Sequence, residues 1–345
     1  MNKQRVNVIS AFEVFLCLFV IFIHLSSEGV TYGNKAGLFA GIMFILNKSV
    51  SFVVPAFIFA SALKLTLKYK DTPVTLKYFI GRITKIYLPY VIWVVIYYAF
   101  FILIHYEDFN PYTLAAYILN GTLVAHFYFI VAIMQFYILM PLFLYIAKKI
   151  PALIGLAGAF VVTLSFIFFT FKNSFVFSFL PGDRWFLAYL IFWMMGVYFA
   201  LNFKAFTDFL HNHKVIVWIS CAFILITHIA LSYANYIGSY IYNAYAAQTM
   251  HMIFCMALPC GFYALCMQYT EPYQKFFRSI GKTTYYVYLS HLLVQFIVEN
   301  FLLKPDYWLV LRFLIKSVFV YTIPFAGAYI YILLKKKLFG KKEAI

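Results

Sequence analysis

The sequence has little charge, and most of its charge is of one sign. Charged residues fill 11% of the 345 positions, with 11 Asp and Glu against 27 Lys and Arg, whereas 65% of the residues are hydrophobic. Soluble domains commonly carry about 25% charged residues. This scarcity of charge excludes an ordinary water-soluble protein and predicts a chain embedded in lipid.

Cysteine is also scarce, and its placement argues against metal and disulfide chemistry. The number of cysteines is odd, and all of them fall in hydrophobic stretches without metal-type pairing beside histidines. They are Cys17, Cys221, Cys255, Cys260 and Cys266. We therefore expect buried, reduced thiols and no metal site. A soluble domain, a low-complexity tract and an internal repeat are missing as well, so residues 1–345 are predicted to form a single transmembrane domain.

Long hydrophobic runs are what the sequence has in place of charge. A helix needs roughly 17 to 25 apolar residues to cross about 30 Å of hydrocarbon, and its backbone must be hydrogen-bonded internally. The sequence therefore predicts an all-α integral membrane protein, a bundle of about ten transmembrane helices. The ten segments are 8–25, 49–67, 86–105, 125–147, 152–171, 185–202, 214–234, 247–269, 283–303 and 307–334.

Positive charge orients this predicted bundle, because Lys and Arg concentrate in cytoplasmic loops. With the N-terminus inside, 20 of the 27 Lys and Arg residues fall in inner segments. The charge count assigns seven to outer segments, namely Lys35, Lys48, Lys172, Arg184, Lys304, Arg312 and Lys316. Both termini are therefore predicted to be cytoplasmic, and the net charge of +16 does not require nucleic acid as a partner. The first apolar run has no small-residue cleavage pattern after it, so we expect no signal peptide.

Two histidines lie within predicted spans, where an ionisable ring is costly and points to function. His24 is about 24 Å from the inner end of the first helix, in its outer half, and the alternative for it is a snorkelling interfacial histidine. Glu13 precedes His24 by eleven residues, which brings it back to within roughly 20° of the same helix face. His291 lies in the late segment SIGKTTYYVYLSHLLVQ, and its alternative is a structural, hydrogen-bonded histidine.

The most basic inner loop reads LKLTLKYKDTPVTLKYFIGRITKIYLPYVIW. Ordinary cytoplasmic charge explains its first lysines. Arg82 and Lys85 differ, because they are three residues apart and project from one face at the foot of the third helix, where a phosphorylated cytosolic donor can bind. Pro89 and Tyr90 follow directly and predict a local break in the helix.

These segments resemble the acyltransferase family 3 of bacterial membrane proteins. The resemblance rests on the first-helix pattern ending in His24, on GRITKIYLPY, on HFYFIVAIMQFYILMPLF and above all on SIGKTTYYVYLSHLL. The family form of the last motif is a glycine, a hydroxyl residue and a Tyr-Leu-x-His ending. Its matches are Gly281, Thr284, Tyr288, Leu289 and His291. The resemblance covers nearly the whole chain, and within the family it is to the stand-alone polysaccharide-modifying proteins of intercellular-adhesin systems.

The resemblance implies O-acylation, usually acetylation, of a hydroxyl on a cell-surface or lipid-linked glycan. The implied donor is an acyl-coenzyme A (acetyl-CoA) made in the cytosol, with no permanently bound cofactor. His24 would be the catalytic group, and Arg82 and Lys85 would bind the donor. The implied place is the bacterial cytoplasmic membrane, as a multi-pass protein in contact with the bilayer, with polysaccharide-synthesis proteins as further partners.

One position departs from the family pattern. The family usually has arginine eleven residues before the catalytic histidine, and Glu13 stands there in this sequence. Either another helix supplies the missing cation, or this subgroup uses a different donor or has lost the transferase reaction.

Acyl transfer to a sugar hydroxyl needs a base for the hydroxyl proton and stabilisation of the oxyanion. A histidine, with an ordinary pKa of about 6.5, suits the first task. We predict that His24 is the base, that Glu13 or Glu28 orients it, and that His291 is a second polar group or proton donor. A covalent acyl relay on histidine is the alternative mechanism. The predicted acceptor contacts are Arg184, Tyr288 and Glu28.

The main alternative function is a polysaccharide or lipid-linked sugar transporter or exporter without transferase activity. A helix bundle with buried polar groups suits that function too. The basic pair Arg82 and Lys85 discriminates, since a coenzyme A site has no purpose in an exporter. A purely structural scaffold does not explain two intramembrane histidines.

Overall fold

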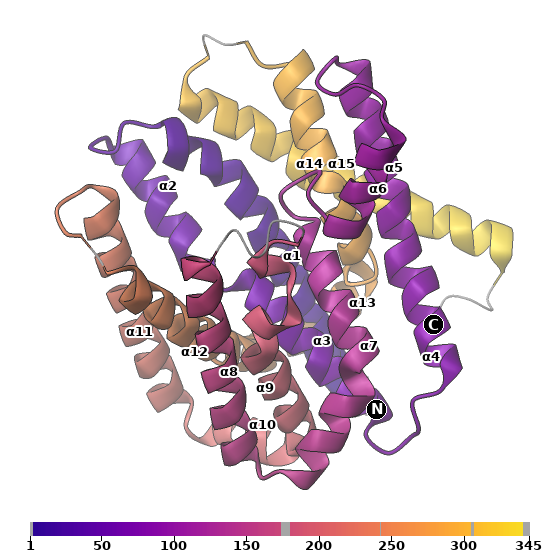
Figure 1. Cartoon of the computed structure of the whole chain (residues 1–345), viewed down its shortest axis with the longest axis vertical. Coiled ribbons are helices and arrows are strands. Elements are labelled where there is room, and N and C mark those ends of the chain that lie inside the picture. Colours follow the sequence, from indigo (N-terminus) through magenta and orange to yellow (C-terminus); the bar gives the residue numbers. More distant parts are fainter. Residues whose placement is uncertain (1–2, 174–179, 242, 305–306, 341–345) are drawn as a thin grey trace. The chain divides into compact units, whose positions relative to one another are not determined.

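The computed structural model describes residues 3–173, 180–241, 243–304 and 307–340 (Figure 1). Most of the described residues are helical and none of them forms a β-strand, which confirms the predicted all-α class. Eight helical stretches of this part are long and apolar enough to cross a membrane, and a ninth is added if one sharply bent helix pair counts as a span. The chain is thus a multi-pass membrane protein, while the number ten and the cytoplasmic termini stay predictions.

The chain divides into two compact units, residues 1–53 with 213–345 (unit 1) and residues 54–212 (unit 2). Unit 1 holds α1 (Lys3–Tyr32), α2 (Leu38–Ser49), α11 (Lys214–Tyr236), α12 (Ala244–Tyr269), α13 (Gln274–Ile280), α14 (Thr284–Phe301) and α15 (Leu309–Phe339). Unit 2 holds α3 (Val53–Tyr69, except its first residue), α4 (Leu76–Arg82), α5 (Leu88–Leu103), α6 (Pro111–Asn120), α7 (Tyr128–Lys149), α8 (Ala152–Lys172), α9 (Leu190–Leu201) and α10 (Phe203–Asn212). A single domain over the whole chain stays a prediction.

Helix α1 is the centre of unit 1. It contacts α2, α12, α13, α14 and α15, so the first and last helices of the chain lie side by side (Figure 1). Apolar side chains on several sides of α1 suit this central position. Ala11, Phe12 and Leu16 are fully buried, and the ring of Phe12 packs edge-on against Tyr263 of α12.

Helix α14 corresponds to the predicted span 283–303, but it is not among the stretches apolar enough to cross a membrane by composition. Its polar side chains explain the difference, because they face neighbouring helices. His291 and Gln295 are buried inside unit 1. A helix enclosed by protein can carry polar groups that lipid would not accept.

Several predicted spans were too short. Helix α1 continues to Tyr32, the second span begins at Leu38, and the third begins at Leu76. Lys48, which the charge count assigns to an outer segment, therefore lies inside α2, while Arg312 and Lys316 lie inside α15, within the predicted span 307–334. Hydropathy locates apolar residues, whereas a helix continues through a polar residue wherever neighbouring helices accommodate its side chain.

In unit 2, α9 forms the core. Eight consecutive residues of α9, 191–198, are buried, and the Trp193 ring stacks on Phe136 of α7 with centroids 4.7 Å apart. Gly196 lets α9 approach α3 closely, since a Cβ there would meet the Phe59 carbonyl and lie 2.6 Å from the Ala62 Cβ. Helices α9 and α10 bend by 96° at their junction.

The predicted break near Pro89 takes the form of a π-helical turn. Helix α4 ends at Arg82, residues Ile83–Tyr87 form the π turn, and α5 follows with Pro89 in its first turn. Proline has no N–H to donate to the carbonyl four residues earlier, and a π turn shifts the hydrogen bonds to five-residue spacing.

Candidate active site

The structure brings His24 and His291 together. They come from α1 and α14 of unit 1, 267 positions apart in the sequence, and their ring centroids are 5.3 Å apart. His291 is fully buried, whereas His24 is only partly buried. We call these two residues the first histidine pair.

The register of α1 against α14 explains this meeting. The Cys17 thiol approaches the Thr284 carbonyl at 3.6 Å. His24 follows Cys17 by seven residues, and His291 follows Thr284 by seven residues. Seven residues are about two helical turns, so two helices packed lengthwise in one direction repeat their contact at this interval. Gly281 of the motif permits the close approach, because a Cβ there would lie 3.2 Å from the Ser10 Cβ of α1.

A backbone hydrogen bond fixes the tautomer of His291. Its Nδ1 lies 2.7 Å from the Tyr288 carbonyl oxygen, and a carbonyl only accepts, so Nδ1–H donates. The neutral ring then carries its lone pair on Nε2, where it can accept a proton. The structure thus ties the motif residue Tyr288 directly to His291, and its ring centroid is 6.1 Å from the imidazole.

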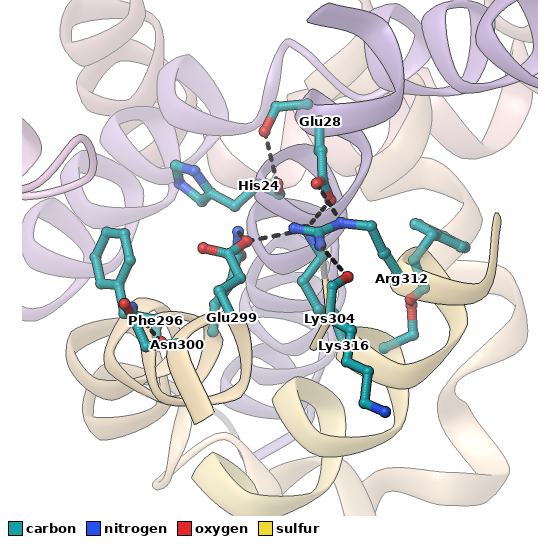
Figure 2. Close-up of polar contacts among 12 residues, drawn as sticks. His24, Glu28, Phe296, Glu299, Asn300, Lys304, Arg312 and Lys316 are labelled. Atoms are coloured by element: carbon teal, nitrogen blue, oxygen red, sulfur yellow. Dashed lines mark hydrogen bonds and ion pairs between the residues drawn. The ribbon is translucent and has the colours of Figure 1, made fainter. Parts of the chain in front are cut away.

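An ion cluster lies on the two helices of the first histidine pair, α1 and α14, and on α15. It consists of Glu28 on α1, Glu299 on α14, and Arg312 and Lys316 on α15 (Figure 2). The Arg312 Nε to Glu28 Oε1 distance is 2.7 Å, and Lys316 Nζ lies 2.5 Å from Glu28 Oε2 and 2.9 Å from Glu299 Oε1. The Lys316 side chain is fully buried. Two acids and two bases balance, as a buried ionic group requires.

The ion cluster continues the stripes that carry the first histidine pair. Glu28 is one turn beyond His24 on α1, and Glu299 is about two turns beyond His291 on α14. Gln295 lies between His291 and Glu299 on α14, and its Nε2 donates to Glu299 Oε1 at 3.0 Å. In Figure 2 the carboxylates of Glu28 and Glu299 meet the cations, while the His24 imidazole points away from Glu28.

Three members of this cluster were missed by sequence reasoning. Arg312 and Lys316 were counted only as outer charges, and Glu299 was not considered. Spacing was the available signal, because Arg312 and Lys316 are four apart on one helix face and Glu299 follows His291 by eight. With them, α15 brings two cations against Glu28 of α1, which is fifteen residues from Glu13.

Glu13 lies on α1, which runs unbroken to His24. The predicted common face is retained, but eleven residues of helix separate the two side chains by about 16 Å along the axis. Any orienting effect of Glu13 on His24 is therefore indirect. Its catalytic role stays a prediction.

The predicted donor-binding pair lies in unit 2. The Arg82 guanidinium is 5.4 Å from the ring centroids of both Tyr78 and Tyr137, a cation–π arrangement that holds the cation. The Tyr78 hydroxyl donates to the Tyr137 carbonyl at 3.1 Å and so fixes one of these rings. Within the described chain, Arg82 Nε is buried without a hydrogen-bond partner. Lys85 is exposed in the π turn, whose wider spacing changes its angle to Arg82 from that of a regular helix.

Arg184 has contacts within unit 2 that account for its position. It forms an ion pair with Asp183, its Nε donates to the Asn120 carbonyl at 3.3 Å, and its own carbonyl accepts from Gln135 at 2.6 Å. Its guanidinium also lies 5.7 Å from the Tyr128 ring centroid. These contacts make Arg184 a link between α7 and the preceding loops, and acceptor binding by it stays a prediction.

Comparison with known proteins identifies the class that this helical fold and its histidine pair belong to. A family model described as an acyltransferase domain matches residues 8–332, so the chain belongs to acyltransferase family 3. Proteins named "Probable poly-beta-1,6-N-acetyl-D-glucosamine export protein" from Staphylococcus aureus strains MSSA476 and N315 are 25% identical over 305 residues, covering 84% of this chain and 82% of theirs. The protein of that name from strain MRSA252 is 24% identical. No solved structure matches the chain.

Proposed function

We propose that this protein transfers an acyl group, acetyl in the simplest case, from cytosolic acyl-coenzyme A to a hydroxyl of a cell-surface or lipid-linked glycan. The observation that carries the proposal is the contact of His24 with His291 in a chain of an acyltransferase family. The place of action is the bacterial cytoplasmic membrane, and proteins of polysaccharide synthesis are the expected partners.

His24 is the base in this proposal. It takes the proton of the acceptor hydroxyl while the hydroxyl oxygen attacks the thioester carbonyl carbon. The carbon–sulfur bond then breaks, and the proton passes to the coenzyme A thiolate, which leaves as a thiol. Because His24 is the less buried of the two rings, it is the one that meets substrate.

His291 supports His24 through its defined tautomer. With Nδ1–H bonded to Tyr288, its Nε2 lone pair can share the proton that His24 has accepted. Two imidazolium ions this close would repel each other, so the pair holds at most one extra proton. The first histidine pair is therefore suited to moving one proton per acyl transfer.

The ion cluster aligns the two histidine helices in this proposal. Glu28 and Glu299 lie on the helices of the two histidines, and both form ion pairs with the cations of α15. Such a cluster keeps α1 and α14 in one register and so preserves the alignment of the imidazoles. Glu28 acts here by positioning α1, beside its predicted contact with acceptor.

Arg82 and Lys85 bind the phosphates of coenzyme A. The tyrosine rings around Arg82 hold its guanidinium while leaving N–H donors for phosphate oxygens. Lys85 adds a second exposed charge. Both residues belong to the segment that is predicted to face the cytosol, where acyl-coenzyme A is made.

Glycan export is the second candidate, because the S. aureus relatives carry that function in their name. The two candidates differ in their need for a donor. An exporter would move poly-β-1,6-N-acetylglucosamine without acyl-coenzyme A, whereas a transferase would consume it.

Reconstituted protein tests the proposal. Liposomes containing the full chain would receive radiolabelled acetyl-CoA and oligomers of β-1,6-linked N-acetylglucosamine, and label on the glycan would be counted. We expect label with wild type and with the exposed-site control Lys204→Gln, and at least about 100-fold less with His24→Gln. Arg82→Gln is expected to raise KM for acetyl-CoA. A wild type that binds glycan yet labels none would refute the proposal and favour export.

A further inference from the structure

Unit 1 contains a second histidine pair, His228 on α11 and His251 on α12. Their ring centroids are 5.3 Å apart, the same separation as in the first pair. His228 is buried, with 4% exposure, and its ring stacks on Phe254 with centroids 4.4 Å apart. The proposed transfer reaction gives these residues no task.

Lys48 brings positive charge to this second pair. It lies in the last turn of α2, which packs against α11. The Phe44 ring of α2 is 5.9 Å from the Tyr233 ring of α11. In the predicted orientation the two helices run in opposite directions, so Lys48, one turn beyond Phe44, lies beside the turn of α11 that carries His228. Among the described residues no carboxylate forms an ion pair with Lys48. Within that same part of the chain, neither ring nitrogen of His228 has a hydrogen-bond partner.

The three residues share one depth in the predicted orientation. Lys48 is about 15 Å from the outer end of α2, His228 about 12 Å from that of α11, and His251 about 10 Å from that of α12. In the predicted orientation, the three residues therefore lie inward of the outer ends of their helices, in the outer half of the bundle.

Charge balance distinguishes this place from the ion cluster. In the ion cluster, two carboxylates balance the charge of two cations. Here, the described residues provide an ammonium and two imidazoles but no carboxylate paired with Lys48, and an uncompensated charge in the membrane is costly. Within the part of the chain that the structure describes, one imidazole nitrogen of this pair contacts a neighbouring side chain, His251 Nε2 at 3.5 Å from the Cys255 thiol. An oxyanion would supply both the missing charge and the missing hydrogen-bond acceptors.

The surroundings indicate how such an oxyanion arrives. Helix α11 is the least buried of the apolar stretches, so lipid can approach along it. A row of cations and rings leads inward from the exposed Lys35. Lys35 Nζ is 5.3 Å from the Tyr236 ring, Tyr236 stacks on Phe44 at 4.2 Å, and Lys48 Nζ is 5.7 Å from Phe44.

We propose that Lys48, His228 and His251 bind the phosphate group of a membrane lipid in the outer half of the bilayer. The lipid tails lie along α11, and the phosphate oxygens accept hydrogen bonds from the ammonium and the imidazoles. A phospholipid and a lipid-linked glycan both offer this chemistry. The site is independent of the proposed transferase reaction, and a binding measurement tests it without any assay of activity.

The test uses the purified full chain in a non-ionic detergent. Native mass spectrometry would measure binding of short-chain phosphatidylglycerol, of a polyprenyl phosphate, and of diacylglycerol as a probe without phosphate. We expect the phosphate lipids to bind at least tenfold more tightly than diacylglycerol. Lys48→Gln and His228→Gln are each expected to weaken phosphate-lipid binding about tenfold and to leave diacylglycerol binding unchanged.

Lys172→Gln is the matched control, because it removes the same charge from an exposed lysine of unit 2. Preference for polyprenyl phosphate would identify a lipid-linked glycan as the ligand, and preference for phosphatidylglycerol would identify a phospholipid; either result supports the site. Phosphate-lipid binding that is equal in wild type, Lys48→Gln and Lys172→Gln would overturn it. So would tighter binding of a fatty acid than of either phosphate lipid, since the occupant would then be a carboxylate.

Discussion

His24 and His291 face each other under different constraints. The imidazole of His291 is buried and hydrogen-bonded to the backbone of its own helix, whereas His24 retains some exposure. A fixed ring is suited to holding a proton, and a partly exposed one to meeting a substrate. Their predicted partnership required two helices at opposite ends of the sequence to pack in one register.

A double-mutant cycle tests whether the first histidine pair acts as a unit. His24→Gln and His291→Gln should each reduce transfer in the liposome assay by roughly 100-fold to 10,000-fold, because each removes one end of the proton path. The double variant should lose no more than the worse single one. His211→Gln, at an exposed histidine of α10, is the control. Losses that multiply in the double variant would mean separate roles.

Lys316→Met tests the ion cluster. The substitution leaves the Glu28 and Glu299 carboxylates without their shared buried cation, which should cost about 3–5 kcal/mol of unfolding free energy. Lys204 forms an exposed pair with Asp208, so Lys204→Met should leave the free energy of unfolding nearly unchanged. Thermal unfolding in detergent, followed by tryptophan fluorescence, measures both. Adding Glu299→Gln to Lys316→Met should restore part of the loss, and equal stability of the two single variants would contradict the cluster's role.

At the scale of elements, close helix contacts depend on single small residues. In unit 2, Gly196 permits the contact of α9 with α3, whereas a Cβ at Gly158 of α8 would meet nothing within 4 Å. The two glycines have the same helical setting and opposite surroundings. They form a matched pair for measuring what the contact contributes.

Gly196→Ala should destabilise the protein, because the new methyl group would collide with the Phe59 carbonyl and the Ala62 side chain. We expect a loss of about 1–3 kcal/mol, as overpacking commonly produces. Gly158→Ala should be neutral or stabilising by up to about 1 kcal/mol, since alanine favours the helix. Chemical or thermal unfolding of both variants measures the two changes in stability. A Gly196→Ala protein as stable as the Gly158→Ala protein would show that the helices can separate freely.

At the scale of the whole molecule, the predicted orientation is open to direct measurement. Asp71 lies in the connection before α4, and Ile241, which is 90% exposed, lies in the connection before α12. With both termini inside, a membrane-impermeant maleimide should label Ile241→Cys on intact cells and Asp71→Cys only after permeabilisation. Unmodified protein is the control for its own cysteines. The reverse labelling pattern would invert the topology.

Composition was enough to predict an all-helical membrane protein, and the position of two histidines within apolar helices was enough to single out His24 and His291. Both depend on local rules, the length of an apolar helix and the repeat of its faces. The contacts of Lys48 and Lys316 were not predicted from the sequence, for a different reason. Their meaning depends on which helix lies opposite, and a count of charges along the sequence assigned both to outer segments, although Lys316 lies within the predicted span 307–334. Arg82 was found, but the tyrosine rings around it required the packing of α4 against α7.

The polarity of α14 also bears on how the chain is made. Ribosomes deliver α14 before α15, and α14 alone would offer Glu299 and His291 to lipid. Lys316 arrives only with α15, and its ion pair with Glu299 makes the two helices acceptable together. We therefore expect the translocon to release α14 and α15 as one hairpin. Assembly of the histidine pair would then complete only after α15 has been made.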